Sequence, residues 1–150
     1  MKSISINRKA NSDYEFETKI EAGLVLTGSE VKSLRNNSAS IKESYIGEKR
    51  SELWLFNFHI GKYQSSSNDK YDPMRIRKIL LSKKEQNKVI GSTTKKGFSI
   101  IPLSLYFNKK GYAKILIGIG RGKKKFDKRQ TIKKKEWDIQ KRRLLKNSQR

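Results

Sequence analysis

The side chains best equipped for chemistry in this 150-residue chain are its cations: 36 lysine and arginine residues stand against 14 acidic residues. A net charge of +22 on 17.5 kDa repels itself, and the phosphate backbone of a nucleic acid is the partner best suited to neutralise it. Outside the C-terminal region the cations form groups: Arg8 and Lys9; Lys32 and Arg35; Arg75, Arg77 and Lys78; Lys95 and Lys96. Alternation places Arg75 and Arg77 on one side of an extended segment, which favours a surface that follows phosphates. Solvated faces without a ligand are the alternative for many of these residues.

Catalysis and metal binding find little support in the sequence. The chain has no cysteine and a single histidine, His59, which excludes thiolate sites, histidine clusters and two-histidine mechanisms. Neither Glu30 nor Asp127 has a second carboxylate or a histidine at a recognisable spacing. The run GIGRGKK lacks the GxGxxG and GxxxxGK[ST] spacings of phosphate loops, so backbone flexibility is the favoured interpretation of its glycines. We therefore expect no catalytic residue, no metal and no cofactor.

The sequence also bears on the compartment. It contains no apolar run approaching the roughly 20 residues of a membrane span, and its first ten residues lack the apolar middle of a secretory signal. A protein of the membrane surface would need an amphipathic helix with a broad apolar face, and the sequence offers none. We expect a cytoplasmic protein without a membrane partner. RNA is favoured over DNA because no helix is suited to a major groove.

Short strands are expected to position these cations. Residues 14–26 alternate and then become an apolar run, which predicts a strand. Thr27 to Glu30 has the form of a capping box, which predicts the start of a short helix. Residues 40–47 and 52–63 predict two strands on either side of the charged turn EKRS. Both faces of the second strand are apolar, so it is expected to be the central strand.

The second half of the chain predicts a helix and a hairpin. A capping box at Ser82 to Glu85 predicts a helix to about Ile90, ended by Gly91. Residues 98–107 and 112–120 flank NKKG, which predicts a hairpin with Gly111 at positive φ. Five or six short antiparallel strands and two short helices indicate a mainly β fold, an OB-like, partly closed antiparallel β-barrel. Its expected domain is residues 1–120, followed by a basic C-terminal tail at 121–150.

The tail contains 14 lysine and arginine residues and three acidic ones. On a helix, Trp137, Leu144 and Leu145 share one stripe, while two isoleucines point to nearly the opposite side. Two narrow apolar ridges among cations suit a groove walled by nucleic acid, where stacking and phosphate neutralisation act together. A permanently disordered tail is the alternative. Self-repulsion predicts that the free tail is disordered until a polyanion supplies the missing charge.

Six segments together carry a resemblance to a known family: NRKANSDYEFETKIEAGLVLTGSEVKSLR, ELWLFNFHI, YDPMRIRKILLSKKE, PLSLYFNKKG, RGKKKFDKR and KKKEWDIQKRRLLKN. They resemble the SsrA-binding protein family, also called small protein B or SmpB, from about Ile6 to the C-terminus. The combination of GSEVKSLR with RGKKKFDKR, in this order, is highly specific. Two departures are Tyr71, where the family usually has histidine, and Phe126, where it commonly has histidine or tyrosine. A histidine-specific role is not available at either place.

The resemblance implies a bacterial adaptor in trans-translation. Such a protein binds the tRNA-like domain of transfer-messenger RNA (tmRNA) and takes it to stalled ribosomes, where its tail enters the decoding site and the empty mRNA channel as a helix. The implied partners are tmRNA, the ribosome through the 16S rRNA of its small subunit, and elongation factor Tu, indirectly, through the charged RNA. The protein itself is expected to be a monomer. A structural ribosomal protein whose basic tail threads rRNA is the alternative.

The resemblance also assigns residues. Glu30 is assigned to tmRNA recognition, and it is expected in an exposed first helical turn where it accepts from base amino groups or orients Lys32 and Arg35. Arg121, Lys123 and Lys124 match the family's basic junction after the last strand. Together with cations from the groups named above, the residues expected to bind RNA are Arg8, Lys9, Glu30, Lys32, Arg35, Arg75, Arg77, Lys78, Arg121, Lys123 and Lys124. Those expected in the decoding site and mRNA channel are Phe126, Asp127, Lys128, Arg129, Trp137, Lys141, Arg142, Arg143, Leu144 and Leu145.

Overall fold

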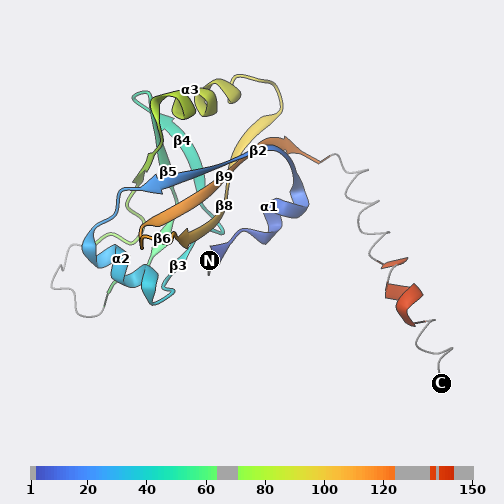
Figure 1. The fold of residues 1–150 in the computed structure, drawn as a ribbon, viewed down its shortest axis with the longest axis horizontal. Helices are drawn as coiled ribbons and strands as arrows, with labels where there is room; N and C mark the ends of the chain where they lie inside the picture. The colour runs from blue at the N-terminus through green and yellow to red at the C-terminus, as the bar shows by residue number, and fades with distance from the viewer. Residues whose placement is uncertain (1–2, 64–70, 124–135, 138, 144–150) are drawn as a thin grey trace.

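The fold is known from a computed structural model, which describes residues 3–63, 71–123, 136–137 and 139–143 (Figure 1). Nine strands and three helices follow one another between residues 3 and 122 of the described chain. They are β1 Ser3–Ile6, α1 Arg8–Asp13, β2 Tyr14–Leu24, α2 Gly28–Arg35, β3 Ala39–Ser40, β4 Tyr45–Lys49, β5 Glu52–Phe56, β6 His59–Ile60, β7 Arg77–Leu80, α3 Lys83–Ser92, β8 Phe98–Phe107 and β9 Ala113–Gly122.

Seven of the nine strands form one curved antiparallel sheet. Seven strands pair in the order β1-β8-β9-β2-β7-β5-β4, and β3 pairs with β6 separately. Strand β4, at one edge, also lies against β8 near the other edge, so the sheet curls into a partly closed barrel. The expected mainly β, antiparallel fold with short helices is confirmed. Strand β1, helix α1 and the short β3–β6 pair were not predicted from the sequence.

The longest strand of the barrel leads directly into a capped helix. β2 alternates half-buried and exposed side chains over Tyr14–Leu24, close to the predicted strand. At its end, the Thr27 hydroxyl accepts a hydrogen bond from the Glu30 N–H at 3.3 Å, and the Glu30 carboxylate accepts one from the Thr27 N–H at 2.9 Å. The predicted capping box is therefore confirmed, and α2 begins where it was expected.

The expectation that residues 52–63 form the central strand is wrong. β5 lies between β7 and the edge strand β4, and it ends at Phe56. Asn57 has φ 58°, and this left-handed residue redirects the chain. Leu53 and Leu55 reach the core from β5, while Phe58 reaches it from beyond the break. The apolar residues on both faces of the predicted strand are therefore explained by a break after Phe56, and not by a central position in the sheet.

The hairpin of β8 and β9 forms as predicted. The side-chain oxygen of Asn108 accepts hydrogen bonds from the N–H groups of Lys110 at 3.1 Å and Tyr112 at 2.8 Å, and Gly111 has φ 84°. Helix α3 differs from the prediction, because it continues through Gly91 to Ser92 and its C-cap is Thr93. The Ser92 hydroxyl donates back to the Val89 carbonyl within the helix.

Candidate nucleic-acid interface

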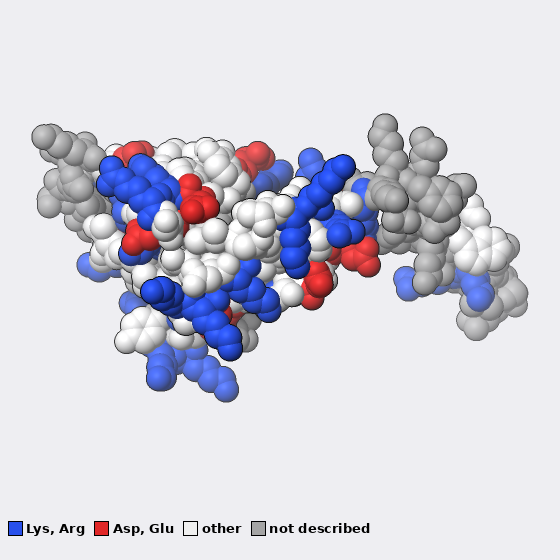
Figure 2. Space-filling view, turned by 90° about the horizontal axis from the view of Figure 1, so that it is seen from above, with Lys and Arg blue, Asp and Glu red and all other residues white. Residues whose placement is uncertain are grey.

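The predicted cations gather at two ends of the molecule. Figure 2 shows lysine and arginine side chains over much of one face, with acidic side chains set among them. Helix α2 lies at one end, and α1 and the last residues of β9 lie at the other, where the chain continues into the tail (Figure 1). The Lys123 N–H donates to the Asp13 carbonyl at 2.8 Å, which ties the start of the tail to the end of α1. Arg8, Lys9, Arg121 and Lys123 therefore belong to the tail end, and Lys32, Arg35 and Arg75 to the α2 end.

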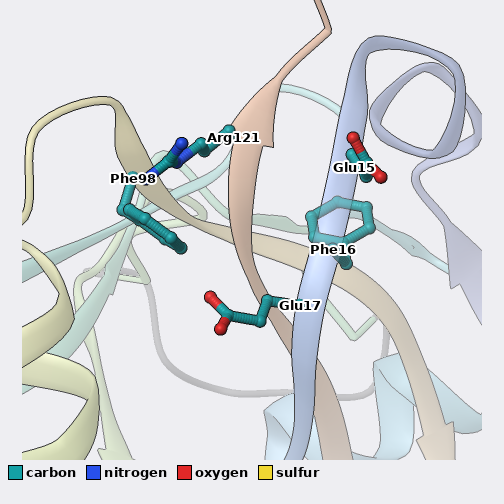
Figure 3. Close-up of a pocket in the computed structure, with 5 residues that line it drawn as sticks. All are labelled: Glu15, Phe16, Glu17, Phe98 and Arg121. Atoms are coloured by element: carbon teal, nitrogen blue, oxygen red, sulfur yellow. The ribbon is translucent and has the colours of Figure 1, made fainter.

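A pocket of about 360 Å³ lies beside the start of the tail (Figure 3). Its lining comes from β2, β8 and β9: Glu15, Phe16, Glu17, Phe98 and Arg121. The guanidinium of Arg121 lies 4.6 Å from the centroid of the Phe98 ring, and the Lys95 ammonium lies 5.5 Å from the same centroid. The aromatic ring thus holds two cations by cation–π attraction. We name these five lining residues the tail-root pocket.

Gly118 and Gly120 of β9 have a packing role, so the interpretation of these two glycines as backbone flexibility is wrong. A Cβ on Gly118 would lie 2.6 Å from the Phe16 ring, and one on Gly120 would lie 2.1 Å from the Glu15 carbonyl oxygen. Both positions therefore require glycine because β2 approaches so closely. Opposite them the register of β2 shifts between Phe16 and Thr18, which makes Glu17 the extra residue of a β-bulge.

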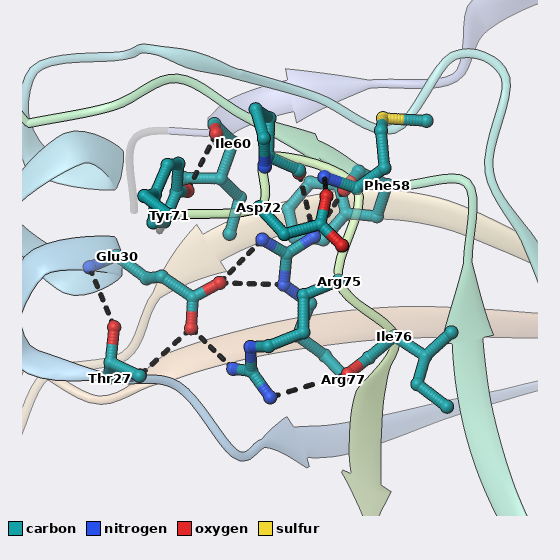
Figure 4. A network of polar contacts seen from close by, with 11 residues as sticks. Thr27, Glu30, Phe58, Ile60, Tyr71, Asp72, Arg75, Ile76 and Arg77 are labelled. Atoms are coloured by element: carbon teal, nitrogen blue, oxygen red, sulfur yellow. Dashed lines mark hydrogen bonds and ion pairs between the residues drawn. The ribbon is translucent and has the colours of Figure 1, made fainter. Parts of the chain in front are cut away.

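At the α2 end, Glu30 is the centre of a buried ionic network (Figure 4). Its Oε1 accepts a hydrogen bond from Arg75 Nη2 at 2.5 Å, and its Oε2 accepts one from Arg77 Nε at 2.7 Å. Arg77 Nη2 lies 2.5 Å from the same Oε2 as an ion pair, but without hydrogen-bond geometry. Arg77 Nη1 donates to the carbonyls of Phe58 and Pro73. The network joins α2 to β7 and to the segments before it.

The network also sets the protonation of its members. Burial raises the pKa of Glu30, but hydrogen bonds from the Thr27 backbone and from the two guanidinium groups, with the charge of Arg77, outweigh burial and leave this pKa below its usual value of 4.5. The Tyr71 hydroxyl donates to the Ile60 carbonyl at 2.7 Å next to the network, and burial raises the pKa of Tyr71. Glu30 is therefore held as a carboxylate, and Tyr71 stays a neutral donor.

Two residues predicted to bind RNA are buried, and a third, Lys78, is partly exposed in an ion pair. Glu30 is only 1% exposed and Arg77 is 0% exposed, so neither side chain is accessible to RNA and the expectation of an exposed Glu30 is wrong. Glu30 orients Arg75 and Arg77 instead of Lys32 and Arg35, because the first turn of α2 faces β7. Lys78 points to the other side of β7 and donates to the Glu52 carboxylate at 3.0 Å.

The accessible cations of this end surround α2. Lys32 and Arg35 are exposed, and their charged groups lie over the rings of Tyr63 at 5.4 Å and Phe107 at 5.9 Å. The Arg75 side chain is 40% exposed although one edge is held by Glu30. Lys32 and Arg35 are thus exposed cations held over aromatic rings, and Arg75 is a partly exposed cation held by Glu30. Exposed cations in fixed positions suit a phosphate-binding surface.

Next to them lies an apolar groove that was not predicted from the sequence. The groove has a volume of about 310 Å³ between the ends of β2 and β7, α2 and the β8–β9 turn. Tyr112 and Leu80 on its walls are 65% and 48% exposed, and Lys114 lies beside them. One signal was available, since alternation in KILL turns Ile79 inward and leaves Leu80 outward. We call this feature the α2-end groove.

Beyond Lys123, the described part of the tail consists of residues 136–137 and 139–143, which are helical and exposed. Trp137 and Ile139 are among the exposed large apolar side chains, and the three cations Lys141, Arg142 and Arg143 share this segment. The other predicted tail residues lie outside the described residues: Lys124, Phe126, Asp127, Lys128, Arg129, Leu144 and Leu145. Whether the tail is disordered when free and helical on the ribosome stays a prediction.

The described part of the chain contains neither a metal-binding cluster nor a membrane-spanning helix. No group of three or more histidine, cysteine or acidic side chains there is placed to hold a metal ion. Among the same residues, no helix has the length and the apolar character needed to cross a membrane.

Comparison with known proteins gives a consistent family match. The family described as "SmpB protein" matches residues 4–147. An SsrA-binding protein of Wolbachia sp. subsp. Drosophila simulans (strain wRi) is 50% identical over 148 residues, covering 99% of each chain. An SsrA-binding protein of Maricaulis maris (strain MCS10) is 50% identical over 144 residues, covering 96% of this chain and 92% of its own.

A solved structure is similar as well. It is described as "tmRNA-SmpB: a journey to the center of the bacterial ribosome", and one of its chains is 43% identical with a TM-score of 0.65. The match covers 80% of this chain and 84% of that chain. The likeness therefore extends to both the sequence and the barrel.

Proposed function

The chain belongs to the SmpB protein family, and from that premise we propose that it binds tmRNA and delivers the tRNA-like domain to stalled ribosomes for trans-translation. Its relatives are SsrA-binding proteins, and its solved neighbour is an SmpB chain in a structure of tmRNA and the bacterial ribosome. It acts as an adaptor between two RNAs and needs no catalytic group, metal or cofactor. Its compartment is the cytoplasm, where ribosomes are found.

The observation that carries this proposal is the surface around α2. The α2-end groove offers an exposed tyrosine and leucine against which an unpaired base can stack, with Lys114 at hand for a phosphate. Lys32, Arg35 and Arg75 border the same end of the barrel with exposed or partly exposed side chains. Apolar contact surface inside a cationic rim is what recognition of a folded RNA loop requires. This end is therefore the tmRNA-binding surface.

The tail end serves the ribosome. Arg121 and Lys123 lie where β9 ends, and the Lys123 backbone is anchored to the end of α1 (Figure 1). Phe126 to Arg129 are assigned to the decoding site, and the helical segment around Trp137 to the empty mRNA channel. Because the two RNA-binding ends are separate, one monomer can hold tmRNA and the small subunit's 16S rRNA together. Elongation factor Tu takes part indirectly, through the charged tmRNA.

The first test is a truncation after Gly122. Residues 1–122 are expected to bind tmRNA with near-normal affinity at low salt, because the α2-end groove is intact. Their affinity should depend less on salt, because the cations of the tail no longer displace counterions. Gel-shift titrations at two salt concentrations measure both effects. Loss of specific binding even at low salt would place the recognition surface in the tail.

A second test concerns Tyr112 in the α2-end groove. Tyr112→Ala is expected to weaken tmRNA binding by about tenfold or more, since stacking of one base contributes about 1–3 kcal/mol. The matched control is Tyr45→Ala, which removes a similarly exposed tyrosine from the edge strand β4 and its stack on Phe56. Gel shifts with tmRNA should distinguish the variants. Equal affinities for the two would remove the groove from the proposed interface.

RNA copurification tests the adaptor role itself. A tagged protein is expected to bring down tmRNA and only a stalled subset of ribosomes. A protein found in equal amount with every ribosome, without tmRNA, would be a structural ribosomal component instead. The amounts of tmRNA and 16S rRNA in the purified complex decide between the two outcomes.

A further inference from the structure

The tail-root pocket is built by features that the tmRNA-binding surface does not use. It lies at the opposite end of the barrel from α2 (Figure 1). Its base is the Phe16 ring, which packs over Gly118 where a Cβ would come within 2.6 Å. Its edge is Glu17, the inserted residue of the β2 bulge. Bulges commonly re-aim a side chain beside a functional site, and here the bulge supplies a carboxylate.

One wall of the pocket is a preformed stacking surface. The Arg121 guanidinium lies 4.6 Å from the centroid of Phe98, so an aromatic ring fixes the planar cation. Guanidinium planes, like aromatic rings, stack on unpaired bases. A positively charged ligand is disfavoured in the same place, because the cations of Arg121 and Lys95 already lie over Phe98. The pocket therefore suits a flat, uncharged ring with polar edges.

The carboxylate beside this wall narrows the choice of ring. In Figure 3, Glu17 extends from β2 toward Phe98, whereas Glu15 lies beyond Phe16. Neither carboxylate forms an ion pair within the described residues. A carboxylate has two acceptor oxygens and no donor. Guanine alone among the RNA bases offers it two adjacent donors, N1–H and the N2 amino group, on the Watson–Crick edge.

We propose that the tail-root pocket binds one unpaired guanine of RNA, with Glu17 accepting from N1–H and the N2 amino group and Arg121 stacked on the base. The pocket volume of about 360 Å³ accommodates a purine. The inference rests on the proposed function only in taking RNA as the natural ligand. It adds a base-specific contact beside the start of the tail, where the cations alone would bind any sequence.

The experiment uses the full chain and fluorescein-labelled RNA pentamers. Each pentamer has uridine at four positions and guanine, hypoxanthine or adenine as its central base. Fluorescence anisotropy at moderate salt gives the dissociation constants, and the shared backbone cancels the nonspecific attraction. Guanine is expected to bind about tenfold more tightly than adenine, as for one bidentate contact. Hypoxanthine lacks the N2 amino group and should lie between them.

Two variants that each remove one negative charge identify the residue that recognises the guanine. Glu17→Gln should abolish the preference for guanine, because its amide presents one acceptor and a repelling donor. Glu48→Gln, at an exposed position on β4 outside the pocket, should retain it. Equal affinity of the unmodified protein for guanine and adenine would overturn the inference, as would an unchanged preference in Glu17→Gln or a loss in both variants. The tmRNA gel shift is scored separately, so these failures leave the proposed function standing.

Discussion

Glu30→Gln is expected to lower the free energy of unfolding by about 3–5 kcal/mol, because it leaves the Arg77 guanidinium buried without a counter-charge. The side chains of Glu30 and Arg77 have no exposed surface, so water cannot replace the lost charge. The substitution also replaces one acceptor oxygen by an NH2 group, whose protons face the donor groups of Arg75 or Arg77. Urea titration followed by circular dichroism measures the loss.

The chain contains a matched control for this substitution. Glu85 occupies the same third position of α3, after the N-cap Ser82, but it is exposed. Glu85→Gln should therefore change the free energy of unfolding by no more than about 0.5 kcal/mol. A loss below about 1 kcal/mol in Glu30→Gln, similar to its control, would mean that Glu30 is only a helix cap.

The pH dependence of unfolding gives the same network a second readout. The folded-state pKa of Glu30 is below its usual value of 4.5, because hydrogen bonds from Thr27, Arg75 and Arg77 outweigh the opposing effect of burial. A group of this kind contributes stability that is present above its unfolded pKa and is lost as pH falls through its folded pKa. The protein should therefore lose stability progressively below about pH 4.5. Glu30→Gln should lack this part of the acid dependence.

Ile139→Pro is expected to abolish peptide tagging while leaving tmRNA binding and arrival at stalled ribosomes intact. Residues 139–143 are helical, and proline inside a helix costs about 3 kcal/mol, or roughly a hundredfold in the population of the helical tail. Free protein should change little, because Ile139 is exposed and packs on none of the barrel's core cluster. A reconstituted tagging reaction on ribosomes without a stop codon measures the effect.

Two controls separate helix formation from side-chain contact. Ile139→Ala removes the same side chain but keeps a strong helix former, so it should retain most tagging. Trp137→Ala should reduce tagging less severely than Ile139→Pro, because it removes one stacking group and leaves the helix. Normal tagging by Ile139→Pro would show that the tail acts only as a flexible polycation.

The sequence by itself determined the features that depend on near neighbours. The capping box of Thr27 and Glu30, the hairpin at Gly111 and the alternation of β2 each involve residues a few positions apart. Local hydrogen bonding and backbone preference decide such features, so a pattern in the sequence is enough. The net charge and the family resemblance were likewise sufficient to predict an RNA partner.

Only the tertiary structure decided which of the predicted residues are exposed and which are buried. Glu30 meets Arg75 and Arg77 at separations of 45 and 47 residues, and their burial follows from the docking of α2 on β7. The α2-end groove and the tail-root pocket each combine three or more distant segments of the chain. Exposure is a property of the packed molecule, because a charged side chain is buried only when a partner elsewhere in the sequence offsets its desolvation. No local pattern records that partner.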